Sequence, residues 1–247
     1  MTARPKAPAR NPLARPPQPP GANAASTTAP LSGAASTELD ALRHDAAALG
    51  VALPDTAFDR LIAYLALLRK WNSAYNLTAV RDAAQMRVQH LADCLAVVAP
   101  LRRQRGSPPQ RLLDVGSGGG LPGVVLAIAE PAWDVSCVDT VGKKAAFIRQ
   151  VAGELALSNL HALHARVETL PGPSFDVITS RAFASLPDFV RLTRSLLAPG
   201  GLWMAMKGRR PDDELAALQR DIDVFHVEPL VVPRLDADRC LIWMRPR

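Results

Sequence analysis

The clearest chemical signal in the sequence is a glycine-rich segment at residues 114–123, DVGSGGGLPG. It follows a short apolar run and precedes a run with helical periodicity. Glycines allow a sharp turn and let a ligand approach the backbone closely. A helix that begins after such a turn offers N–H groups without helical partners. We therefore interpret the segment as a nucleotide-binding turn between a strand and a helix.

The loop alone fits two classes of cofactor. Its residues 118, 120 and 123 satisfy the GxGxxG fingerprint of dinucleotide-binding folds. The glycines at 116, 118 and 120, preceded by Asp114, instead resemble the first motif of class I methyltransferases. A tight turn without a ligand is the third interpretation, and the strand–turn–helix context disfavours it.

Two acids bear on this choice. Asp139 ends the next predicted strand, where a carboxylate would accept hydrogen bonds from the ribose hydroxyls of either cofactor. Asp114 favours the methyltransferase, because a carboxylate beside the loop would repel a pyrophosphate but not a sulfonium or an amino group. We also expect no separate substrate domain of the kind that a dehydrogenase needs.

The segments around the loop predict alternating strands and helices. Strands are expected at 111–115, 135–138, 161–164, 175–179 and 202–206, with closing strands at 224–232 and 240–244. Helices are expected at 122–129, 143–155, 186–197 and 212–221. This alternation predicts an α/β fold, a Rossmann-like, mostly parallel sheet with helices on both faces.

Upstream of the sheet, the periodicity predicts an N-terminal helical extension. Helices are expected at 37–49, 56–71 and 82–98, within a helical subdomain at 37–101. Pro100 and residues 102–110 should break the chain before the cofactor-binding domain at 110–247. Residues 1–36 are rich in Pro and Ala and contain no acid, so we expect a disordered basic tail. A transit peptide and an RNA-binding arm are the alternatives.

Composition excludes several classes of protein. Hydrophobic residues make up 48% of the 247 residues, so a packed core is feasible, and no uninterrupted apolar run is long enough to span a membrane. The three cysteines are isolated, which predicts neither a metal site nor disulfides and fits a reducing cytoplasm. Four of the six net positive charges lie in the tail, leaving +2 for the rest, which is weak evidence for a nucleic-acid partner.

A series of motifs in register is more specific than the loop. The motifs are Trp71-Asn72-x-x-x-Asn76-Leu77-Thr78, His90-x-x-Asp93, the glycine loop, Val138-Asp139, Lys143-Lys144-x-x-Phe147, Arg166-Val167-Glu168, Ser180-Arg181-Ala182-Phe183 and Lys207-Gly208. Over residues 55–207 the chain thereby resembles the RsmG (GidB) family of methyltransferases. The resemblance implies S-adenosylmethionine as cofactor and methylation of guanine N7 in the 530 loop of 16S rRNA, at the family's target guanine 527.

The resemblance also implies cofactor-binding residues, some of which have simpler explanations. The expected cofactor contacts are Gly116, Gly118, Gly120, Leu121, Asp139, Val167, Glu168 and Arg181. Asp139 would bind the ribose, Val167 and Glu168 would face the adenine, and Arg181 would lie near the site of methyl transfer. Taken alone, Glu168 could be a solvated loop acid and Arg181 a surface ion-pair partner.

Guanine N7 carries a lone pair and no proton, so it can attack the sulfonium methyl directly in an SN2 step. We therefore expect no general base, and we expect Arg181 to act by positioning and electrostatics. The motifs of other methyltransferase classes are missing, which agrees with attack by N7. Residues 180–183 are Ser-Arg-Ala-Phe, whereas exocyclic amine methyltransferases have an Asp/Asn-Pro-Pro-aromatic motif there. No cysteine follows the fourth strand closely, as a cytosine C5 enzyme would need.

The substrate contacts are less constrained by the sequence. The candidates for RNA binding are Asn72, Asn76, His90, Lys143 and Lys207. A helix cap, a core histidine and solvated lysines are the alternatives. The expected partner is 16S rRNA, either in the small ribosomal subunit or in its assembly intermediate, and the expected enzyme is a cytoplasmic monomer. A nicotinamide-dependent oxidoreductase and a noncatalytic RNA-binding protein remain as alternative functions.

Overall fold

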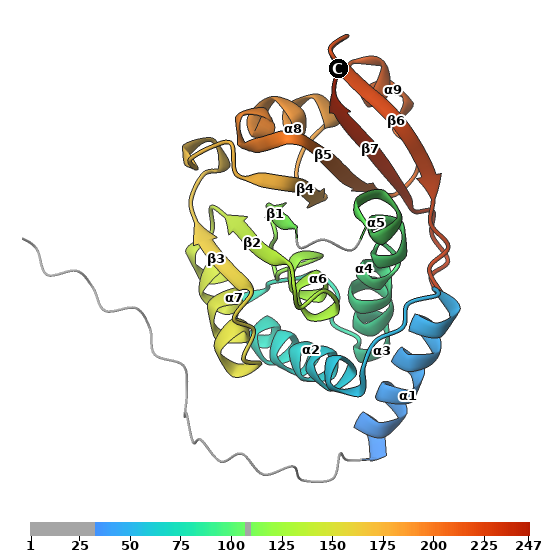
Figure 1. The fold of residues 1–247 in the computed structure, drawn as a ribbon. Coiled ribbons are helices and arrows are strands. Elements are labelled where there is room, and N and C mark those ends of the chain that lie inside the picture. Colours follow the sequence, from blue (N-terminus) through green and yellow to red (C-terminus); the bar gives the residue numbers. More distant parts are fainter. Residues whose placement is uncertain (1–32, 107–109) are drawn as a thin grey trace, which may run out of the picture. The chain divides into compact units, whose positions relative to one another are not determined.

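A computed structural model of the chain describes residues 33–106 and 110–247 (Figure 1). Most of the tail predicted over 1–36 therefore lies outside the described residues. Its last four residues are helical, because the first helix, α1 (Gly33–Ala48), begins before the predicted start at residue 37. From α1 onward the described chain belongs to one compact unit.

The centre of this unit is a seven-stranded sheet with the order β3-β2-β1-β4-β5-β7-β6. Its strands are β1 (Arg111–Val115), β2 (Asp134–Asp139), β3 (Leu160–His164), β4 (Phe175–Arg181), β5 (Leu197–Lys207), β6 (Ile222–Pro229) and β7 (Cys240–Pro246). The first five strands run parallel, and β7 runs antiparallel to both β5 and β6. The predicted α/β class is thus confirmed. β5 begins before the strand predicted at 202–206, and its register against β4 shifts between Leu197 and Leu202.

Alternate side chains of the strands enter two different cores. Leu112 of β1 packs on one face, while the adjacent Leu113 packs on the other. The first core lies under α6 (Gly123–Ala129) and α7 (Gly142–Glu154). The second lies under α8 (Leu186–Thr193), with the short helices η2 (Val167–Thr169), η3 (Arg194–Leu196) and α9 (Asp212–Ala216) nearby. Burial on both faces explains why a central strand such as β1 is apolar without alternation.

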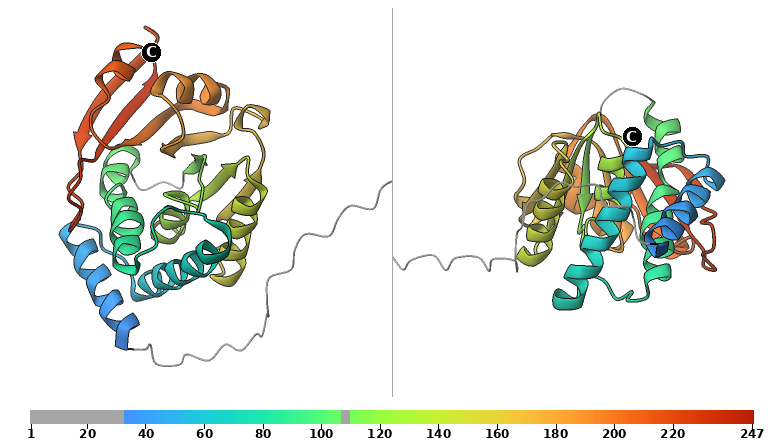
Figure 2. Two further views of the ribbon diagram at one scale, coloured as in Figure 1. Left: turned by 180° about the vertical axis from the view of Figure 1, so that it is seen from behind. Right: turned by 90° about the horizontal axis from the view of Figure 1, so that it is seen from below.

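The N-terminal helices pack on the α6/α7 side and share its core (Figures 1 and 2). They are α1, α2 (Asp55–Tyr75), α3 (Ala83–Met86), the π-helix η1 (Arg87–Ala92), α4 (Asp93–Leu95) and α5 (Val98–Arg105). The single helix predicted at 82–98 was wrong, because a π-helical segment interrupts it. The predicted break at Pro100 was also wrong. Pro100 lies in the first turn of α5, where the missing N–H would have no helical partner.

A buried acid ties α1 to the rest of this helical layer. Asp45 is fully buried, and its carboxylate pairs with Arg87 of η1 and, at 3.2 Å, with Arg234 in the loop before β7. Such a pair stabilises the fold only while both charges keep their partners, because an unpaired buried charge is costly.

The strand order reverses between β1 and β4, and this reversal places the site. Ligands of open α/β sheets bind beyond the carboxyl ends of the strands at such a switch point. Asp139, Arg181 and Lys207 are the last residues of β2, β4 and β5. Three side chains singled out in the sequence therefore lie at the carboxyl ends of parallel strands, along the same edge of the sheet.

None of the helices in the described ranges combines the length and the apolar character that crossing a bilayer requires.

Thr193→Val tests how α8 is fixed to the sheet. The buried Thr193 hydroxyl donates to the carbonyl of Phe189 at 2.6 Å and accepts from the indole nitrogen of Trp203 at 2.9 Å. Valine has nearly the same shape but leaves this buried indole N–H without a partner, so we expect a loss of about 1–3 kcal/mol in the free energy of unfolding. Urea unfolding measures it. Thr193→Ser keeps the hydroxyl and is the control, and a valine variant as stable as the serine variant would contradict this account.

Candidate functional site

The glycine loop is bound to the end of β2 through its own N–H groups. The amides of Gly116 and Ser117 donate to the carbonyl of Val138 at 2.9 and 3.2 Å. The amide of Gly118 donates to Asp139 Oδ2 at 3.0 Å. The sequence predicted unpaired N–H groups at the start of the helix. In α6, which begins at Gly123, the Gly123 amide donates to Asp114 Oδ2 at 2.8 Å and the Val124 amide donates to the carbonyl of Gly120 at 2.7 Å, so these amides have partners as well. The loop can bind a ligand through its shape more than through free amides.

Two residues of the glycine motif lie behind the loop. Gly120 is buried with φ +90°, and a Cβ there would collide with Val124 in the first turn of α6. Gly120 lines neither of the hollows described below, so its predicted cofactor contact is not found, and its glycine serves loop–helix packing.

Asp114 is also behind the loop. Its carboxylate is fully buried and accepts a hydrogen bond from the Gly123 amide at 2.8 Å through Oδ2. Oδ1 has no hydrogen-bond partner in the described part of the chain. Burial raises the pKa of this carboxyl to about 7. Asp114 therefore anchors the end of the loop. The sequence predicted its carboxylate next to the cofactor, whereas the structure buries it behind the loop.

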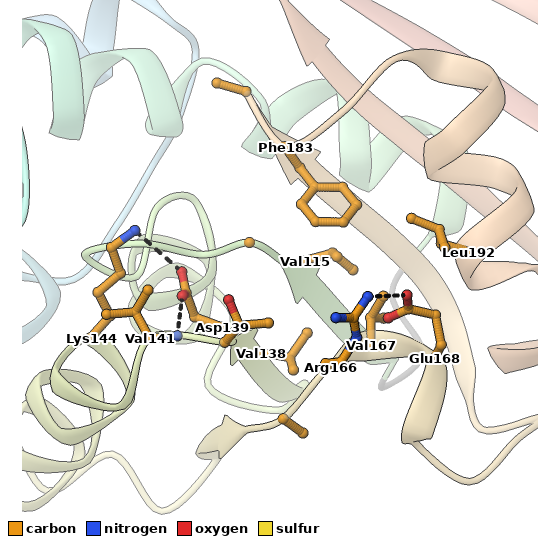
Figure 3. Close-up of a pocket in the computed structure, with 14 residues that line it drawn as sticks. Val115, Val138, Asp139, Val141, Lys144, Arg166, Val167, Glu168, Phe183 and Leu192 are labelled. Carbon is orange, nitrogen blue, oxygen red and sulfur yellow. Dashed lines mark hydrogen bonds and ion pairs between the residues drawn. The ribbon is translucent and has the colours of Figure 1, made fainter.

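A first hollow of about 480 Å³ lies beyond β1, β2 and η2 (Figure 3). Asp139 lies on its wall and accepts from the Val141 amide at 2.8 Å through Oδ1, while Lys144 Nζ lies 3.6 Å from Oδ2. Each carboxylate oxygen keeps a lone pair for a further donor. The apolar wall is formed by Val115, Val138, Val167, Phe183 and Leu192. The hollow thus combines an apolar wall with a carboxylate, Asp139, that has free lone pairs.

Residues 167 and 168 lie in η2 on the rim of this hollow. Val167 is buried and contributes its apolar side chain to the wall. Glu168 is exposed, and its carboxylate is 3.3 Å from Arg166 Nη2. That ion pair spans the rim beside the apolar slot (Figure 3). Both residues thus line the hollow, as expected for contacts with an adenine.

A second hollow, also of about 480 Å³, lies between the glycine loop and the N-terminal helical layer. Its lining includes Gly116, Gly118 and Leu121 from the loop, Leu77 and Thr78 from the segment after α2, and Asp93, Arg181, Lys207 and Arg239. The two hollows share Gly116 and Ala182 in their linings. They therefore meet at the switch point. The charged residues that line the first hollow are two acids and two cations, whereas those that line the second are one acid and three cations.

Phe183 lies at the junction of the two hollows. A Cβ at Gly116 would come within 2.6 Å of a ring carbon of Phe183, so the aromatic ring rests on this bare backbone. Ala182 before it has φ +58°, a left-handed conformation that turns the chain away after β4.

Two of the predicted RNA-binding residues are buried. Asn72 donates to the carbonyl of Val80 at 3.1 Å and accepts from the Thr78 amide at 2.8 Å. His90 Nε2 lies 2.8 Å from the Thr78 hydroxyl, and burial, reinforced by the nearby Arg181, lowers its pKa to about 4. Their exposed fractions of 3% and 4% argue against direct RNA contact. Both side chains instead fix the segment that brings Thr78 to the second hollow.

The other three predicted RNA-binding residues are more accessible. Asn76 is exposed and caps the end of α2 in a left-handed conformation. Lys143 donates to the carbonyl of Tyr75 at 2.9 Å and lines neither hollow. Lys207 lines the second hollow, but its amine is paired with Glu214 at 2.7 Å. An RNA contact by these three residues stays a prediction.

Sequence reasoning gave no site role to Asp93, Phe183 or Arg239. Asp93 and Phe183 lie in motifs that were noted, but nothing local indicated what they contact. Arg239 follows an acidic loop without a recognisable pattern, and it reaches the site only because β7 returns antiparallel beside β5. In the described ranges, no cluster of three His, Cys, Asp or Glu side chains could hold a metal ion.

The raised pKa of Asp114 predicts a pH-dependent stability. The folded protein binds this proton more tightly than the unfolded chain does, so its contribution to stability is lost as the pH rises from about 4 to about 7. Asp114→Asn keeps an oxygen for the Gly123 amide and does not titrate. Between about pH 5 and pH 8 we expect the wild type to lose about 2–3 kcal/mol relative to this variant in urea unfolding. If the free energy of unfolding depended on pH in the same way in both proteins, the burial of this charge would be ruled out.

Comparisons with known proteins agree with this geometry. The family model GidB, described as rRNA small subunit methyltransferase G, matches residues 58–242. Ribosomal RNA small subunit methyltransferase G of Leptothrix cholodnii is 64% identical over 208 residues, which cover 84% of this chain and 95% of that relative. The protein of the same name from Acidovorax sp. strain JS42 is 61% identical, with 83% and 94% covered.

Among solved structures, the similarity is one of fold. The 1,6-didemethyltoxoflavin-N1-methyltransferase of Burkholderia thailandensis, solved with S-adenosylhomocysteine, superposes with a TM-score of 0.52 at 19% identity, covering 74% of this chain and 89% of that chain. TrmN from Thermus thermophilus has a TM-score of 0.52 at 24% identity, with 62% and 49% covered. Given the family match over most of its length, the chain belongs to the GidB family, the rRNA small subunit methyltransferases G.

Proposed function

We propose that the chain transfers a methyl group from S-adenosylmethionine to N7 of a guanine in the 530 loop of 16S rRNA. The observation that carries this proposal is the pair of joined hollows at the switch point. The first has an apolar wall beside Asp139, and the second contains Arg181 and more cations than acids. A nucleoside fits the first, and an anionic RNA segment with a flipped base fits the second.

The residues of the two hollows suit this methyl donor. Asp139 has free lone pairs for two ribose hydroxyls, and Val138 and Val167 offer apolar surface to an adenine. Gly118 leaves the backbone bare in the second hollow, and each hollow has the size of an ordinary ligand pocket. S-adenosylmethionine, when bound, supplies an electrophilic methyl group on a cationic sulfur.

The chain's own task is to orient the guanine and to accommodate the charge that moves onto it. N7 has a lone pair and no proton, so no side chain has to remove one. The acid and the histidine nearest Arg181 suit no such role, because Asp93 is paired with two arginines and the neutral, buried His90 has a pKa of about 4. Arg181 has N–H donors that can bind the guanine O6, the acceptor next to N7. Its role is therefore positioning and electrostatic.

A nicotinamide cofactor is less well supported. The GxGxxG interpretation relies on free amides and a helix N-terminus for the pyrophosphate. In the loop, the amides of Gly116, Ser117 and Gly118 are already paired, and α6 is only seven residues long.

The remaining parts of the proposal concern the substrate and its setting. The chain acts as a monomer in the cytoplasm on the small ribosomal subunit or an assembly intermediate. All three cysteines are buried and unpaired, which fits a reducing compartment. Asn76, Lys143 and Lys207 contact the RNA around the second hollow, with the lysines as phosphate partners.

Substitution of the target atom tests the reaction. A small-subunit RNA carrying 7-deazaguanine at the target position has a carbon in place of N7 and no lone pair there. We expect methyl transfer from labelled donor to unmodified RNA, in naked RNA or in 30S particles, and at least about a hundredfold less to the deaza RNA. A label on another atom or another nucleotide would contradict the proposed specificity. Binding without any transfer would indicate a noncatalytic RNA-binding protein.

Gly118→Ala tests the cofactor assignment. Gly118 has φ +58°, and a Cβ there meets no atom closer than 4.0 Å, so the methyl group would project into the open second hollow. We expect S-adenosylmethionine affinity to fall at least about tenfold in calorimetry. Gly50→Ala is the matched control, since Gly50 has φ +66° in open space away from the site. Both variants should lose about 1–2 kcal/mol of stability from the left-handed backbone, and unchanged affinity in Gly118→Ala would reject the assignment.

A further inference from the structure

Asp93 is a buried acid shared by two arginines of the second hollow. Its side chain is 1% exposed, and it caps the π-helix η1. Arg181 Nη1 donates to Oδ2 at 3.1 Å, and Arg239 Nε donates to Oδ1 at 2.8 Å. The arginines come from the end of β4 and the start of β7, so one carboxylate joins the helical layer to two strands.

The two arginines keep donors for a ligand. Arg181 uses Nη1 for both Asp93 and the Gln89 carbonyl, at 3.1 and 2.9 Å. Arg239 uses Nε for Asp93 and Nη1 for the carbonyl of Asp238. A guanidinium has five N–H donors, so each group retains some that Asp93 orients but does not occupy. Both side chains are 24% exposed, in agreement with this arrangement.

Asp93 lowers the net positive charge of the second hollow. Among its described lining residues, Asp93 is the only acid, beside Arg181, Arg239 and Lys207. Lys207 is neutralised by Glu214, which comes from α9. Two guanidinium charges and one carboxylate therefore leave about one net positive charge, and removing the carboxylate would leave about two. A cationic ligand would then be repelled more strongly, because charges interact over several ångströms in a partly buried site.

We propose that Asp93 is a positioning residue that orients Arg181 and Arg239 and supplies the negative charge that lets both share the pocket with a cationic sulfur. This inference rests on the proposed function, since it takes S-adenosylmethionine as the ligand. In this proposal Asp93 contacts neither the ligand nor the reacting atoms. It acts by orienting the two arginines and through the electrostatic field of its carboxylate. A sulfonium donor and its neutral product, S-adenosylhomocysteine, differ by one methyl group and one charge, so their relative affinity reports that field.

Calorimetry with the two ligands on the full chain tests this inference. We expect Asp93→Asn to lower the affinity for S-adenosylmethionine relative to S-adenosylhomocysteine by about fivefold or more. Arg239→Met removes a positive charge from the same group and should shift the ratio in the opposite direction. Because these two variants change the charge with opposite signs, a general loosening of the pocket cannot produce both results.

The chain contains a matched control in Asp45. It is equally buried and also lies between two arginines, Arg87 and Arg234, but it lines neither hollow. Asp45→Asn should cost stability and leave the ligand ratio within about twofold of the wild type. If Asp93→Asn does not fold, the ratio of the two ligand affinities in Arg239→Met still tests the inference.

The outcomes separate this inference from the proposed function. If the wild type binds neither ligand, the proposed function fails. If the wild type binds both, and the ratio stays unchanged in Arg239→Met and in any folded Asp93→Asn protein, then Asp93 is a structural residue only and this inference fails alone. An equal shift in Asp45→Asn would also overturn it, because the effect would then not depend on the hollow.

Discussion

Hydrogen bonds from the glycine loop to the end of β2 determine the shape of the site. The amides of Gly116 and Ser117 donate to Val138, and the amide of Gly118 donates to Asp139. These bonds hold the loop against the strand that also carries the ribose-binding candidate. The loop is thereby fixed without a ligand, and both hollows open on either side of Gly116. Without this attachment, neither hollow would have a defined wall.

The N-terminal helices complete the site as well as cover the sheet. The Tyr64 hydroxyl of α2 donates to the carbonyl of Gly119 at 2.7 Å, which supports the loop from the side opposite β2. The π-helix η1 contributes the Gln89 carbonyl to the arginine group, and Asp93 follows η1 directly as the first residue of α4. π-Helical turns often occur at functional sites, because they displace carbonyls and side chains from the regular helical pattern. The helical layer is therefore part of the active-site construction and is joined to the sheet by charged contacts.

Much of the fold was predictable because the signals were local. Apolar runs gave the parallel strands, and the loop glycines marked the turn after β1. The position of Asp139 on the wall of the first hollow could be predicted, because the residue ends a strand beside that turn. The burial of Asn72 and of His90 could not be predicted, because the spacing of residues along a helix does not show which face of that helix is buried. A glycine in the motif likewise does not reveal whether it faces a ligand or a helix, as Gly120 illustrates.

The contacts that sequence reasoning missed connect segments far apart in the chain. Asp93 and Arg239 are separated by 146 residues, and only the return of β7 beside β5 brings them together. The central claim is that these contacts build one continuous site for the methyl donor. A crystal structure with S-adenosylhomocysteine tests it most directly. The account predicts adenine against Val138 and Val167 with both ribose hydroxyls on Asp139, and a ligand bound elsewhere, or a ribose away from Asp139, would contradict it.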